Sequence, residues 1–359
     1  MTPPAARDGS AASNDGVPGL RRCPRPLSEA YDTALLDLDG VVYLGRAAIP
    51  GVPEALRKVV AAGMGLAYVT NNASRTTGAI AEQLVALGVP AHPGSVITSA
   101  HAAARILSER LPPGAPVLVI GGSGLRLAVR ERGLRPVTTA RDRPAAVVQG
   151  YAPDVGYSLL AEGALAVAAG ALFVASNVDA TLPSARGRQP GNGALVQVIA
   201  TATGTRPIVA GKPEPPMHAE AVRRTGARRP LIVGDRLDTD IEGANRVGAD
   251  SLLVLTGVSG PTELVLAPPQ RRPSYLAADL GGLLEAHDVA GGGPREPFGS
   301  NGWRARWVSG AVGGTGERIE LTGSGDRIDA LRVLCAAAWS RGSVTLGMVA
   351  GALESAGLS

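Results

Sequence analysis

The sequence predicts an α/β protein whose core is a doubly wound parallel β-sheet. From Thr33 onward, short and nearly continuous apolar runs alternate with segments of helical pattern. Proline recurs at the start of the predicted helices and glycine just after their ends, which is the usual capping asymmetry. A second stretch of the same alternation follows a proline-rich break, LPPGAP, at residues 111–116. Apolar strands that alternate with helices are typical of parallel sheets.

The first part of the predicted core covers residues 31–110. Its expected strands are TALLDL (33–38), GLAYVT (65–70) and SVITS (95–99). The helical patterns that follow them are PEALRKVVAAG (53–63), TTGAIAEQLVALG (76–88) and AHAAARILSER (100–110). This order predicts a Rossmann-like arrangement, in which helices join parallel strands and cover both faces of the sheet.

Residues 111–206 are predicted to form a large α/β unit inserted into that core. The apolar runs PVLVIG, AAVVQG (145–150) and ALFVAS (171–176) alternate there with helical patterns, the last of which is GALVQVIATATG (193–204). The core is then expected to resume over residues 207–288, because LIVGDRLDTDIEGANRVGADSLLVLTG (231–257) reads as a further strand–helix–strand unit.

The two ends of the chain have a different composition. Residues 1–30 are rich in proline, glycine, alanine and serine, which predicts a flexible tail. Residues 289–302 include AGGGPREPFGSNG and are expected to be a linker. Residues 303–359 are expected to form a small C-terminal α+β unit, with WRARWVSG and RIELTG as strands and DRIDALRVLCAAAWS and VTLGMVAGALES as helices.

The overall composition excludes several classes of protein. The net charge is +4, but the arginines are scattered and form no basic run, so no nucleic-acid partner is expected. No run of about 18 apolar residues indicates a membrane span. Two cysteines form no disulfide framework, which favours a cytoplasmic location. The oligomeric state stays open, with a homodimer as one expectation.

Polar side chains follow the predicted core strands at the points where these strands end. They are Asp37 and Asp39 after the first strand, Thr70, Asn71 and Asn72 after the second, Asp235 and Asp240 after LIVG, and Lys212 before Pro213. The carboxyl ends of parallel strands meet at one edge of the sheet, where ligands bind. We therefore expect these side chains to lie close together.

This set of side chains indicates a particular chemistry. Oxygen ligands without a histidine or cysteine cluster favour a hard cation, so magnesium is the expected metal. A hard cation, one lysine, and hydroxyl or amide donors can hold a phosphoryl group. Asp37 would then attack phosphorus, and Asp39 would donate a proton to the leaving oxygen.

Four motifs resemble those of the haloacid dehalogenase-like (HAD) superfamily, in the order that this superfamily requires. They are DLDGVVYLG, VTNN, GKPEP and GDRLDTD. The position of the insertion, together with LDLDGVVYLG, TNNASRT and GDRLDTDI, is similar to the NagD and 4-nitrophenylphosphatase subfamily, which includes glycerol-phosphate, phosphoglycolate and pyridoxal-phosphate phosphatases. The resemblance covers about residues 31–288 and implies a magnesium-dependent phosphatase with a substrate-selecting cap at residues 111–206.

The resemblance implies a role for each acidic residue. Asp37 would be the nucleophile that forms an aspartyl phosphate and would also bind magnesium. Asp39 would act as general acid and base, and its backbone carbonyl would be a magnesium ligand. Asp235 would bind the metal directly, and Asp240 would orient the waters around it.

The remaining motif residues are implied to hold the substrate's phosphate. Thr70, Asn71 and Asn72 would contact phosphate oxygens, and Lys212 would bridge the nucleophile and the phosphate. A phosphomutase, which uses a similar site, and a non-enzymatic metabolite sensor are the alternative functions.

The identity of the substrate is expected to depend on the cap. Asn177 and Asp179 fit the subfamily pattern, and Leu182, before Pro183, resembles the glycerol-phosphate and phosphoglycolate branch. Glycerol 3-phosphate is therefore the leading expectation for the small phosphorylated metabolite. Phosphoglycolate and other sugar or nucleotide monophosphates are the alternatives. The arginines at positions 186 and 188 are either substrate contacts or loop surface.

Three further features remain outside the motifs. VIGGSGLRL (119–127) is similar to a dinucleotide-binding loop but has Leu127 where a third glycine is needed, so it is expected to form a tight turn in the cap. His218 is expected on a helix surface. The C-terminal unit has no acyl-CoA-binding loop, which favours a structural or regulatory role, and cutting the chain after residue 288 would leave every motif in place.

Overall fold

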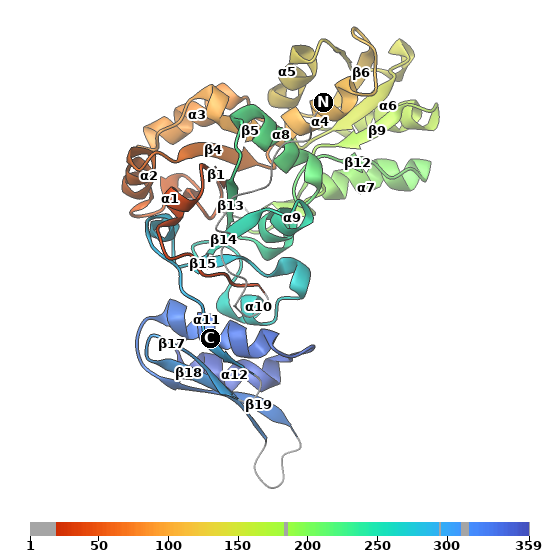
Figure 1. Ribbon diagram of the computed structural model, residues 1–359. Coiled ribbons are helices and arrows are strands. Elements are labelled where there is room, and N and C mark those ends of the chain that lie inside the picture. The colour runs from red at the N-terminus through yellow and green to blue at the C-terminus, as the bar shows by residue number, and fades with distance from the viewer. Residues whose placement is uncertain (1–18, 183–185, 294–295, 310–315, 359) are drawn as a thin grey trace, which may run out of the picture.

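The computed structural model of the chain describes residues 19–182, 186–293, 296–309 and 316–358. These residues form three units: a central core, a cap beside it, and a C-terminal unit at the other end of the core (Figure 1). Among the described residues, no helix is long and apolar enough to cross a membrane.

The core is built on a six-stranded parallel sheet with the order β15-β14-β13-β1-β4-β5. Its strands are β1 (Thr33–Leu36), β4 (Gly65–Thr70), β5 (Val96–Thr98), β13 (Pro230–Gly234), β14 (Asp250–Val254) and β15 (Tyr275–Ala277). β1 lies in the middle, with β13 on one side and β4 on the other. The segments that follow these three strands therefore lie side by side at the carboxyl edge of the sheet.

Helices cover both faces of this sheet, as the sequence predicts. They are α2 (Val52–Ala61), α3 (Thr77–Ala86), α4 (Ser99–Ser108), α8 (Pro215–Thr225) and α9 (Glu242–Arg246). Alternate residues of β1 enter different cores, because Leu36 packs with α2 and α3 whereas Leu35 packs with α4 and α8. The predicted doubly wound α/β fold is thereby confirmed.

The cap has a parallel sheet of its own, with the order β12-β9-β8-β6-β7. It consists of β6 (Pro116–Ile120), α5 (Ser123–Glu131), β7 (Arg135–Val137), β8 (Ala146–Gln149), α6 (Tyr157–Ala168), β9 (Leu172–Ala175), α7 (Asn192–Thr203) and β12 (Ile208–Val209). A two-stranded hairpin, β10 (Thr181–Leu182) and β11 (Gln189–Pro190), projects from it. The last cap strand ends at Val209, three residues beyond the boundary predicted at 206.

Short elements complete the core. They are α1 (Leu27–Ala30), β2 (Tyr43–Leu44), β3 (Ala47–Ala48), α10 (Pro261–Val265), the 3-10 turns Pro93–Ser95, Pro269–Arg271 and Leu280–Leu284, and η3 (Leu237–Ile241); the turn Ala140–Asp142 belongs to the cap. η3 is a single wide turn of helix that leads from β13 into α9.

Residues 19–30 differ from the flexible tail predicted for residues 1–30. Cys23 and His287 exchange two backbone hydrogen bonds of 2.8 Å, and Leu27 is completely buried against the core. The composition is misleading here because three well-spaced apolar residues, Leu20, Cys23 and Leu27, are enough to anchor a proline-rich segment. Residues 1–18 of the predicted tail lie outside the described residues.

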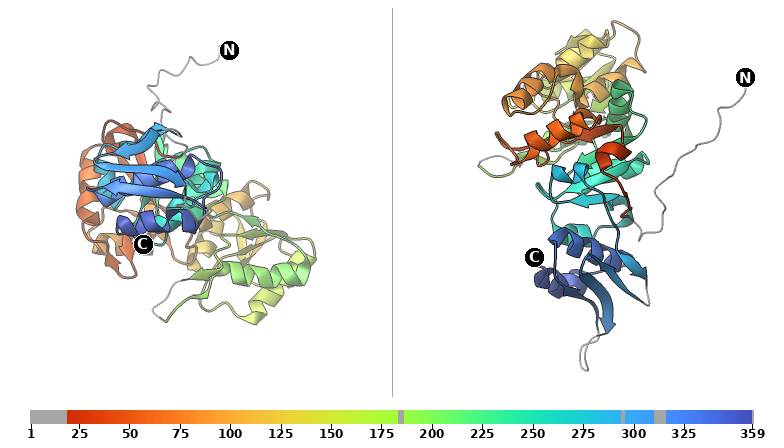
Figure 2. Two further views of the ribbon diagram at one scale, coloured as in Figure 1. Left: turned by 90° about the horizontal axis from the view of Figure 1, so that it is seen from below. Right: turned by 60° about the vertical axis from the view of Figure 1, so that its left-hand side comes forward.

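The C-terminal unit is a four-stranded antiparallel sheet with two helices, seen in the left view of Figure 2. Its elements are β16 (Gly291–Gly293), β17 (Glu296–Ser300), β18 (Trp303–Ser309), β19 (Glu317–Gly323), α11 (Arg327–Trp339) and α12 (Leu346–Ser355). The linker predicted at 289–302 therefore contains the first two strands. The glycines occur in β16, which is an edge strand, and Pro297 of β17 lies opposite the register shift between Gly291 and Gly293, where a proline is tolerated.

The C-terminal unit and the core share one hydrophobic cluster. Core residues such as Leu253 and Leu264 pack in that cluster together with the buried face of α11. Trp339 donates an indole hydrogen bond of 3.1 Å to the carbonyl of Val265, and the guanidinium of Arg272 lies 5.0 Å from its ring centre. Removing this unit would therefore expose part of the core, although every sequence motif lies outside it.

We expect Trp339→Ala to destabilise the protein without altering its site. Deleting a buried tryptophan costs about 3–5 kcal/mol of unfolding free energy, and the Val265 carbonyl also loses its donor. Chemical denaturation measures the loss, and kcat per folded molecule should stay the same. Trp307→Ala is the control, because Trp307 is only half-buried and bonds to Ala337 within the unit. A wild-type unfolding midpoint for Trp339→Ala would contradict the shared cluster.

Candidate active site

Asp37 and Asp39 lie in the turn that follows β1. The backbone N–H of Asp37 donates to Val233 of β13 at 2.9 Å, which continues the sheet for one residue. Leu38, between the two aspartates, is 1% exposed and points into the core. The chain then turns at Gly40, whose φ of 83° disfavours other residues. Both carboxylates thus lie at the carboxyl edge of the sheet, and Asp39 is closer to solvent than Asp37.

Lys212 lies between two carboxylates. Its Nζ donates to Asp37 Oδ1 and to Asp240 Oδ1, both at 2.6 Å, and to the carbonyl oxygen of Val69 at 3.1 Å. The side chain is 4% exposed. Burial alone would lower the pKa of Lys212, but the two carboxylates raise it above its usual value. The ammonium group is therefore charged and fixed in place by three acceptors.

Three carboxylates converge on a point suited to a cation. Oxygen atoms of Asp37, Asp235 and Asp240 lie within 4.8 Å of one another. Burial raises the pKa of Asp37 to about 8 and that of Asp235 to about 6, and neighbouring carboxylates add to both shifts while Lys212 opposes them. A divalent cation would offset this repulsion and keep the carboxylates ionised.

Asp235 shows best that these residues fit magnesium. Its side chain is completely buried, and Oδ2 accepts a hydrogen bond of 2.7 Å from the N–H of Val258. Its Oδ1 is buried and has no hydrogen-bond partner in the described parts of the chain. A β-carbon at Gly40 or Gly257 would lie 2.4 or 2.0 Å from Oδ2, so only glycine fits at these positions. An orphaned carboxylate oxygen beside two other carboxylates is a suitable ligand for a hard cation.

The predicted phosphate-binding residues follow β4 but differ in burial and in hydrogen-bond partners. Thr70 is buried, and its hydroxyl oxygen accepts the N–H of Asn72 at 3.1 Å. Asn72 is exposed, and its Oδ1 accepts bonds from the backbone and the hydroxyl of Ser74. Asn71 has its side chain engaged with the Lys212 backbone, because Oδ1 accepts the Lys212 N–H at 2.8 Å and Nδ2 donates to the Lys212 carbonyl at 3.1 Å. The Asn71 side chain thus holds the backbone of Lys212 in place.

Two of the predicted cap residues meet Asn71. Asn177 Nδ2 donates to the Asn71 carbonyl at 2.8 Å, and Asn71 Nδ2 donates to Asp179 Oδ2 at 3.2 Å. Asn192 of the cap in turn supports Asn177 through a bond of 2.7 Å to its carbonyl. Burial raises the pKa of the Asp179 carboxyl group. The cap is therefore attached to the core at the residue that holds the Lys212 backbone.

We expect Asn71→Ala to lower kcat by about tenfold or more, because Lys212 would lose the two bonds that fix its backbone. A displacement of a catalytic group by about 1 Å can lower the rate about a hundredfold. Steady-state phosphate release measures the change. Asn245→Ala is a matched control, since the Asn245 side chain also bonds two backbone carbonyls but lies away from the carboxylates. Equal kcat values for the two variants would argue against a positioning role.

The VIGGSGLRL segment forms the predicted tight turn, at the entrance to α5 in the cap. The backbone of this turn packs directly on the core loop after β4, with the N–H of Gly124 donating to the Ser74 carbonyl at 3.1 Å. A β-carbon at Gly122 or Gly124 would lie 2.5 or 2.1 Å from carbonyl oxygens of Ser74 and Arg75. These glycines are explained by the contact between cap and core.

Three residues near the site have no role assigned from the sequence. Tyr43 and Arg75 lie close enough to Asp39 to lower its pKa, against the burial that raises it. The Arg236 guanidinium bonds to Asp238 at 2.9 and 3.0 Å, and its charge lowers the pKa of Asp179 in the cap. Arg236 lies within the motif GDRLDTD, directly after Asp235. This position could have identified it as a residue near the site.

Other predicted residues lie in the cap hairpin and in α8. Leu182 lies half-buried in the β10–β11 hairpin, and Pro183 is outside the described residues. Arg186 and Arg188 are exposed beyond it. His218 is 1% exposed, so the prediction of a helix-surface position was wrong: it packs against Gly243 in the interior.

Comparison with known proteins shows which family this chain resembles. Residues 34–135 match a model described as haloacid dehalogenase-like hydrolase, and residues 209–283 match one described as HAD-hydrolase-like. A D-glycerol 3-phosphate phosphatase of Mycobacterium tuberculosis is 44% identical over 317 residues, 88% of this chain and 88% of that protein. An acid sugar phosphatase of Staphylococcus aureus is 39% identical over 64% of this chain and 88% of its own.

Solved structures extend the comparison to the fold. A glycerol phosphate phosphatase of M. tuberculosis in complex with magnesium has a TM-score of 0.81 and 40% identity, covering 93% of this chain and all of that one. A mutant thermostable NPPase of Geobacillus stearothermophilus has a TM-score of 0.64 and 34% identity, covering 70% of this chain and 96% of its own. Because residues 1–288 are only about four fifths of the chain, the first match reaches the C-terminal unit, beyond the limit predicted at 288.

Proposed function

The chain belongs to the haloacid dehalogenase-like hydrolases and is a phosphatase of phosphomonoesters, and from this premise we propose its mechanism and its substrate. We propose that it hydrolyses a small phosphorylated metabolite through an aspartyl phosphate on Asp37, with glycerol 3-phosphate as the leading substrate. The observation that carries the proposal is the cluster of Asp37, Asp235 and Asp240, two of which, Asp37 and Asp240, hold the Lys212 ammonium.

In the first step a carboxylate oxygen of Asp37 attacks the phosphorus atom, and the bond from phosphorus to the ester oxygen breaks. Asp39 donates a proton to that leaving oxygen. Partial burial raises the pKa of Asp39, which favours the protonated form needed for this role. Lys212, hydrogen-bonded to Asp37, holds positive charge beside the phosphoryl oxygens during the transfer.

In the second step water attacks the phosphorus of the aspartyl phosphate. Asp39, now ionised, takes the proton of that water, and the bond from phosphorus to the Asp37 oxygen breaks. Inorganic phosphate leaves and both aspartates return to their starting states. Asp37, Asp235 and Asp240 are the side chains that would hold magnesium, with the Asp39 carbonyl as a further ligand. Magnesium, when bound, supplies charge that stabilises the transferring phosphoryl group.

The choice of glycerol 3-phosphate rests on the relatives. The M. tuberculosis glycerol phosphate phosphatase matches all three units of this chain, whereas the acid sugar phosphatases match 64% of it. Asn177 and Asp179 join the cap to Asn71, which supports the proposal that cap residues near them contact the alcohol part of a substrate. The free, buried cysteines Cys23 and Cys335 fit the proposed cytoplasmic location.

The test is the release of inorganic phosphate from a panel of phosphate esters in the presence of magnesium. Glycerol 3-phosphate, phosphoglycolate, a hexose phosphate and a nucleoside monophosphate are compared by kcat/KM. The highest value is expected for glycerol 3-phosphate. An isomeric sugar phosphate formed without free phosphate would identify a phosphomutase, and no turnover of any ester would support a metabolite sensor.

Removal of the metal is a separate prediction. We expect EDTA to abolish phosphate release, because the carboxylates would repel one another and the transferring group would lose its main charge stabilisation. Added magnesium in excess of the chelator should restore the full rate. Undiminished turnover after exhaustive dialysis against EDTA, with metal content measured by atomic emission, would contradict the metal-dependent mechanism.

A further inference from the structure

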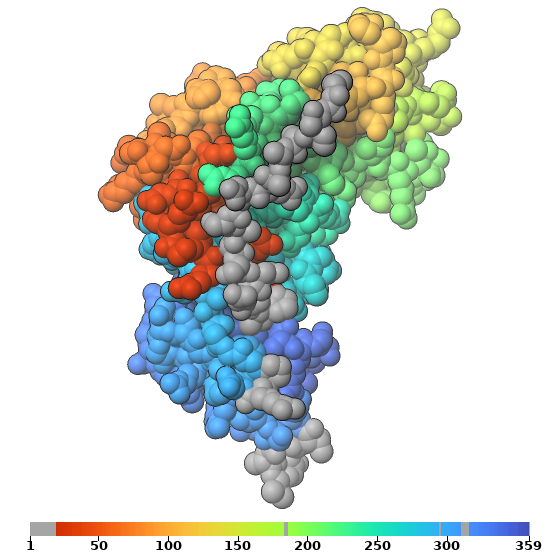
Figure 3. All heavy atoms as spheres, viewed as in Figure 1, coloured from red at the N-terminus to blue at the C-terminus, as the bar shows by residue number. Residues whose placement is uncertain are grey.

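A second concave site lies at the amino edge of the core sheet, the edge opposite to the carboxylates. It is a cleft of about 1070 Å³ bounded by the segment 21–25, by α8 and by the starts of β13 and β14. In Figure 3 the first described residues (red) and the segment around α8 (green) lie on the same face. One stripe of α8, from Pro215 through His218 and Val222 to Arg223, forms a wall. A volume of this order exceeds what a single phosphate ion needs.

The cleft is lined by more arginines than its acidic side chains can neutralise. Arg25, Arg228 and Arg229 line it, and their side chains form no hydrogen bond or ion pair with any residue in the part of the chain that the structure describes. Asp250 is the acidic residue in the wall, and Arg21, Tyr31 and Ser274 already occupy it. Three guanidinium groups therefore remain available to an anionic ligand.

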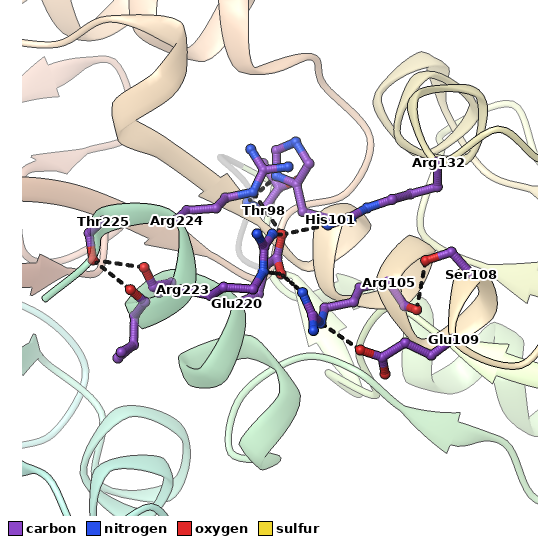
Figure 4. Close-up of polar contacts among 12 residues, drawn as sticks. Thr98, His101, Arg105, Ser108, Glu109, Arg132, Glu220, Arg223, Arg224 and Thr225 are labelled. Atoms are coloured by element: carbon purple, nitrogen blue, oxygen red, sulfur yellow. Dashed lines mark hydrogen bonds and ion pairs between the residues drawn. The ribbon is translucent and has the colours of Figure 1, made fainter. Parts of the chain in front are cut away.

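The neighbouring cluster around Glu220 adds to this charge (Figure 4). The Glu220 side chain is fully buried and binds four arginines: Arg105 of α4, Arg132 of the cap, and Arg223 and Arg224 of α8. Among the described residues, Arg105 alone of these four has a second carboxylate partner, Glu109. Four cations against two anions leave an excess of positive charge, and Arg223 also lines the cleft.

His218 adds a neutral polar group to the wall of the cleft. It lines the cleft, is 1% exposed, and neither ring nitrogen has a hydrogen-bond partner. Burial, and then the charge of Lys212, lowers the pKa of His218 to about 3, so the ring is neutral and offers one donor and one acceptor. A β-carbon at Gly243 would lie 2.6 Å from Nε2, so this nitrogen faces the interior, and the ring adds no charge to the cleft.

We propose that this cleft is a binding site for a nucleoside polyphosphate, separate from the active site. Arg25, Arg228 and Arg229 would hold the phosphates. The apolar part of the wall, with Pro215, Val222 and Pro230, would accommodate the nucleoside. α8 links the two sites physically, because it begins three residues after Lys212.

The test is a fluorescence titration with N-methylanthraniloyl-ADP (mant-ADP) at fixed ionic strength. EDTA is present so that magnesium-dependent hydrolysis does not consume the probe. The double variant Arg228→Ala, Arg229→Ala is compared with Arg304→Ala, Arg318→Ala, which removes the same charge from exposed positions on the C-terminal sheet. Lys212→Ala removes the cation of the active site. Circular dichroism establishes that each variant is folded.

We expect saturable binding with one site per chain, weakened at least tenfold in the cleft variant and less than twofold in the other two. Unlabelled ADP should displace the probe, and inorganic pyrophosphate should do so at least tenfold less well. Binding lost in Lys212→Ala but kept in the cleft variant would place the nucleotide in the active site and overturn the proposal. So would equal displacement by pyrophosphate, equal weakening by both arginine pairs, or no saturable binding.

Discussion

Asp37→Asn is expected to abolish turnover, with a fall in kcat of more than about 10³-fold, because an amide cannot accept the phosphoryl group. The fold should survive the change. The amide oxygen can still accept from Lys212 Nζ, which lies 2.6 Å from Asp37 Oδ1. Burial raises the pKa of the Asp37 carboxyl to about 8, so replacing that carboxylate also removes a poorly solvated charge.

The measurement combines phosphate release with thermal unfolding and with mass spectrometry of the peptide that contains position 37. The last is needed because deamidation would regenerate aspartate. Asp288→Asn is the control: Asp288 is 58% exposed and, among the described residues, its side chain bonds to Arg22 alone, at 3.3 Å, so its loss should be nearly silent. Near-normal turnover in a uniformly amidated protein would contradict the role of Asp37 as nucleophile.

Lys212→Arg should lower kcat at least tenfold, although nearly all the other basic residues of this sequence are arginines. Lys212 Nζ fits among Asp37, Asp240 and the carbonyl of Val69 as a small donor with three directions. A guanidinium is planar and wider, so it would displace one of these partners or move the substrate out of line. Because the position is 4% exposed, the larger group should also cost about 1–3 kcal/mol of unfolding free energy.

Lys58→Arg provides the comparison within the same chain. Lys58 is 62% exposed and forms an i,i+4 pair of 2.8 Å with Glu54 on α2, a contact that arginine can reproduce. Both kcat and the unfolding midpoint should match the wild type. Full activity in Lys212→Arg, equal to that of Lys58→Arg, would mean that the geometry around Nζ does not limit catalysis.

The fold of the core and cap could be predicted because their signals are local and repeated. β1, β4 and β13 are short apolar runs between helices, and each one ends in polar residues. The parallel arrangement then places those ends together without further information. The same reasoning failed at residues 19–30 and 289–302, because a few anchoring side chains or backbone ladder bonds order a segment whose composition resembles a loop.

The site could be predicted as a set of residues but not as a network. Asn71 looks like a phosphate ligand in VTNN, yet its amide serves the backbone of Lys212, which is 141 residues away in sequence. His218 is a polar residue and is therefore expected on a helix surface, yet it faces Gly243. Such contacts depend on how distant elements approach each other, which no local pattern in the chain records.

The sheet order has a consequence for how the chain folds during synthesis. β1 pairs with β4 soon after both have left the ribosome, but its other neighbour, β13, is about 200 residues further on, since Leu36 pairs with Val233. Until then one edge of β1 stays open, and unpaired strand edges invite aggregation. The cap, whose strands are neighbours in sequence, can fold during that interval. Closing the core sheet is thus a late, long-range step, and slow translation between the cap and β13 would prolong the exposure of the β1 edge.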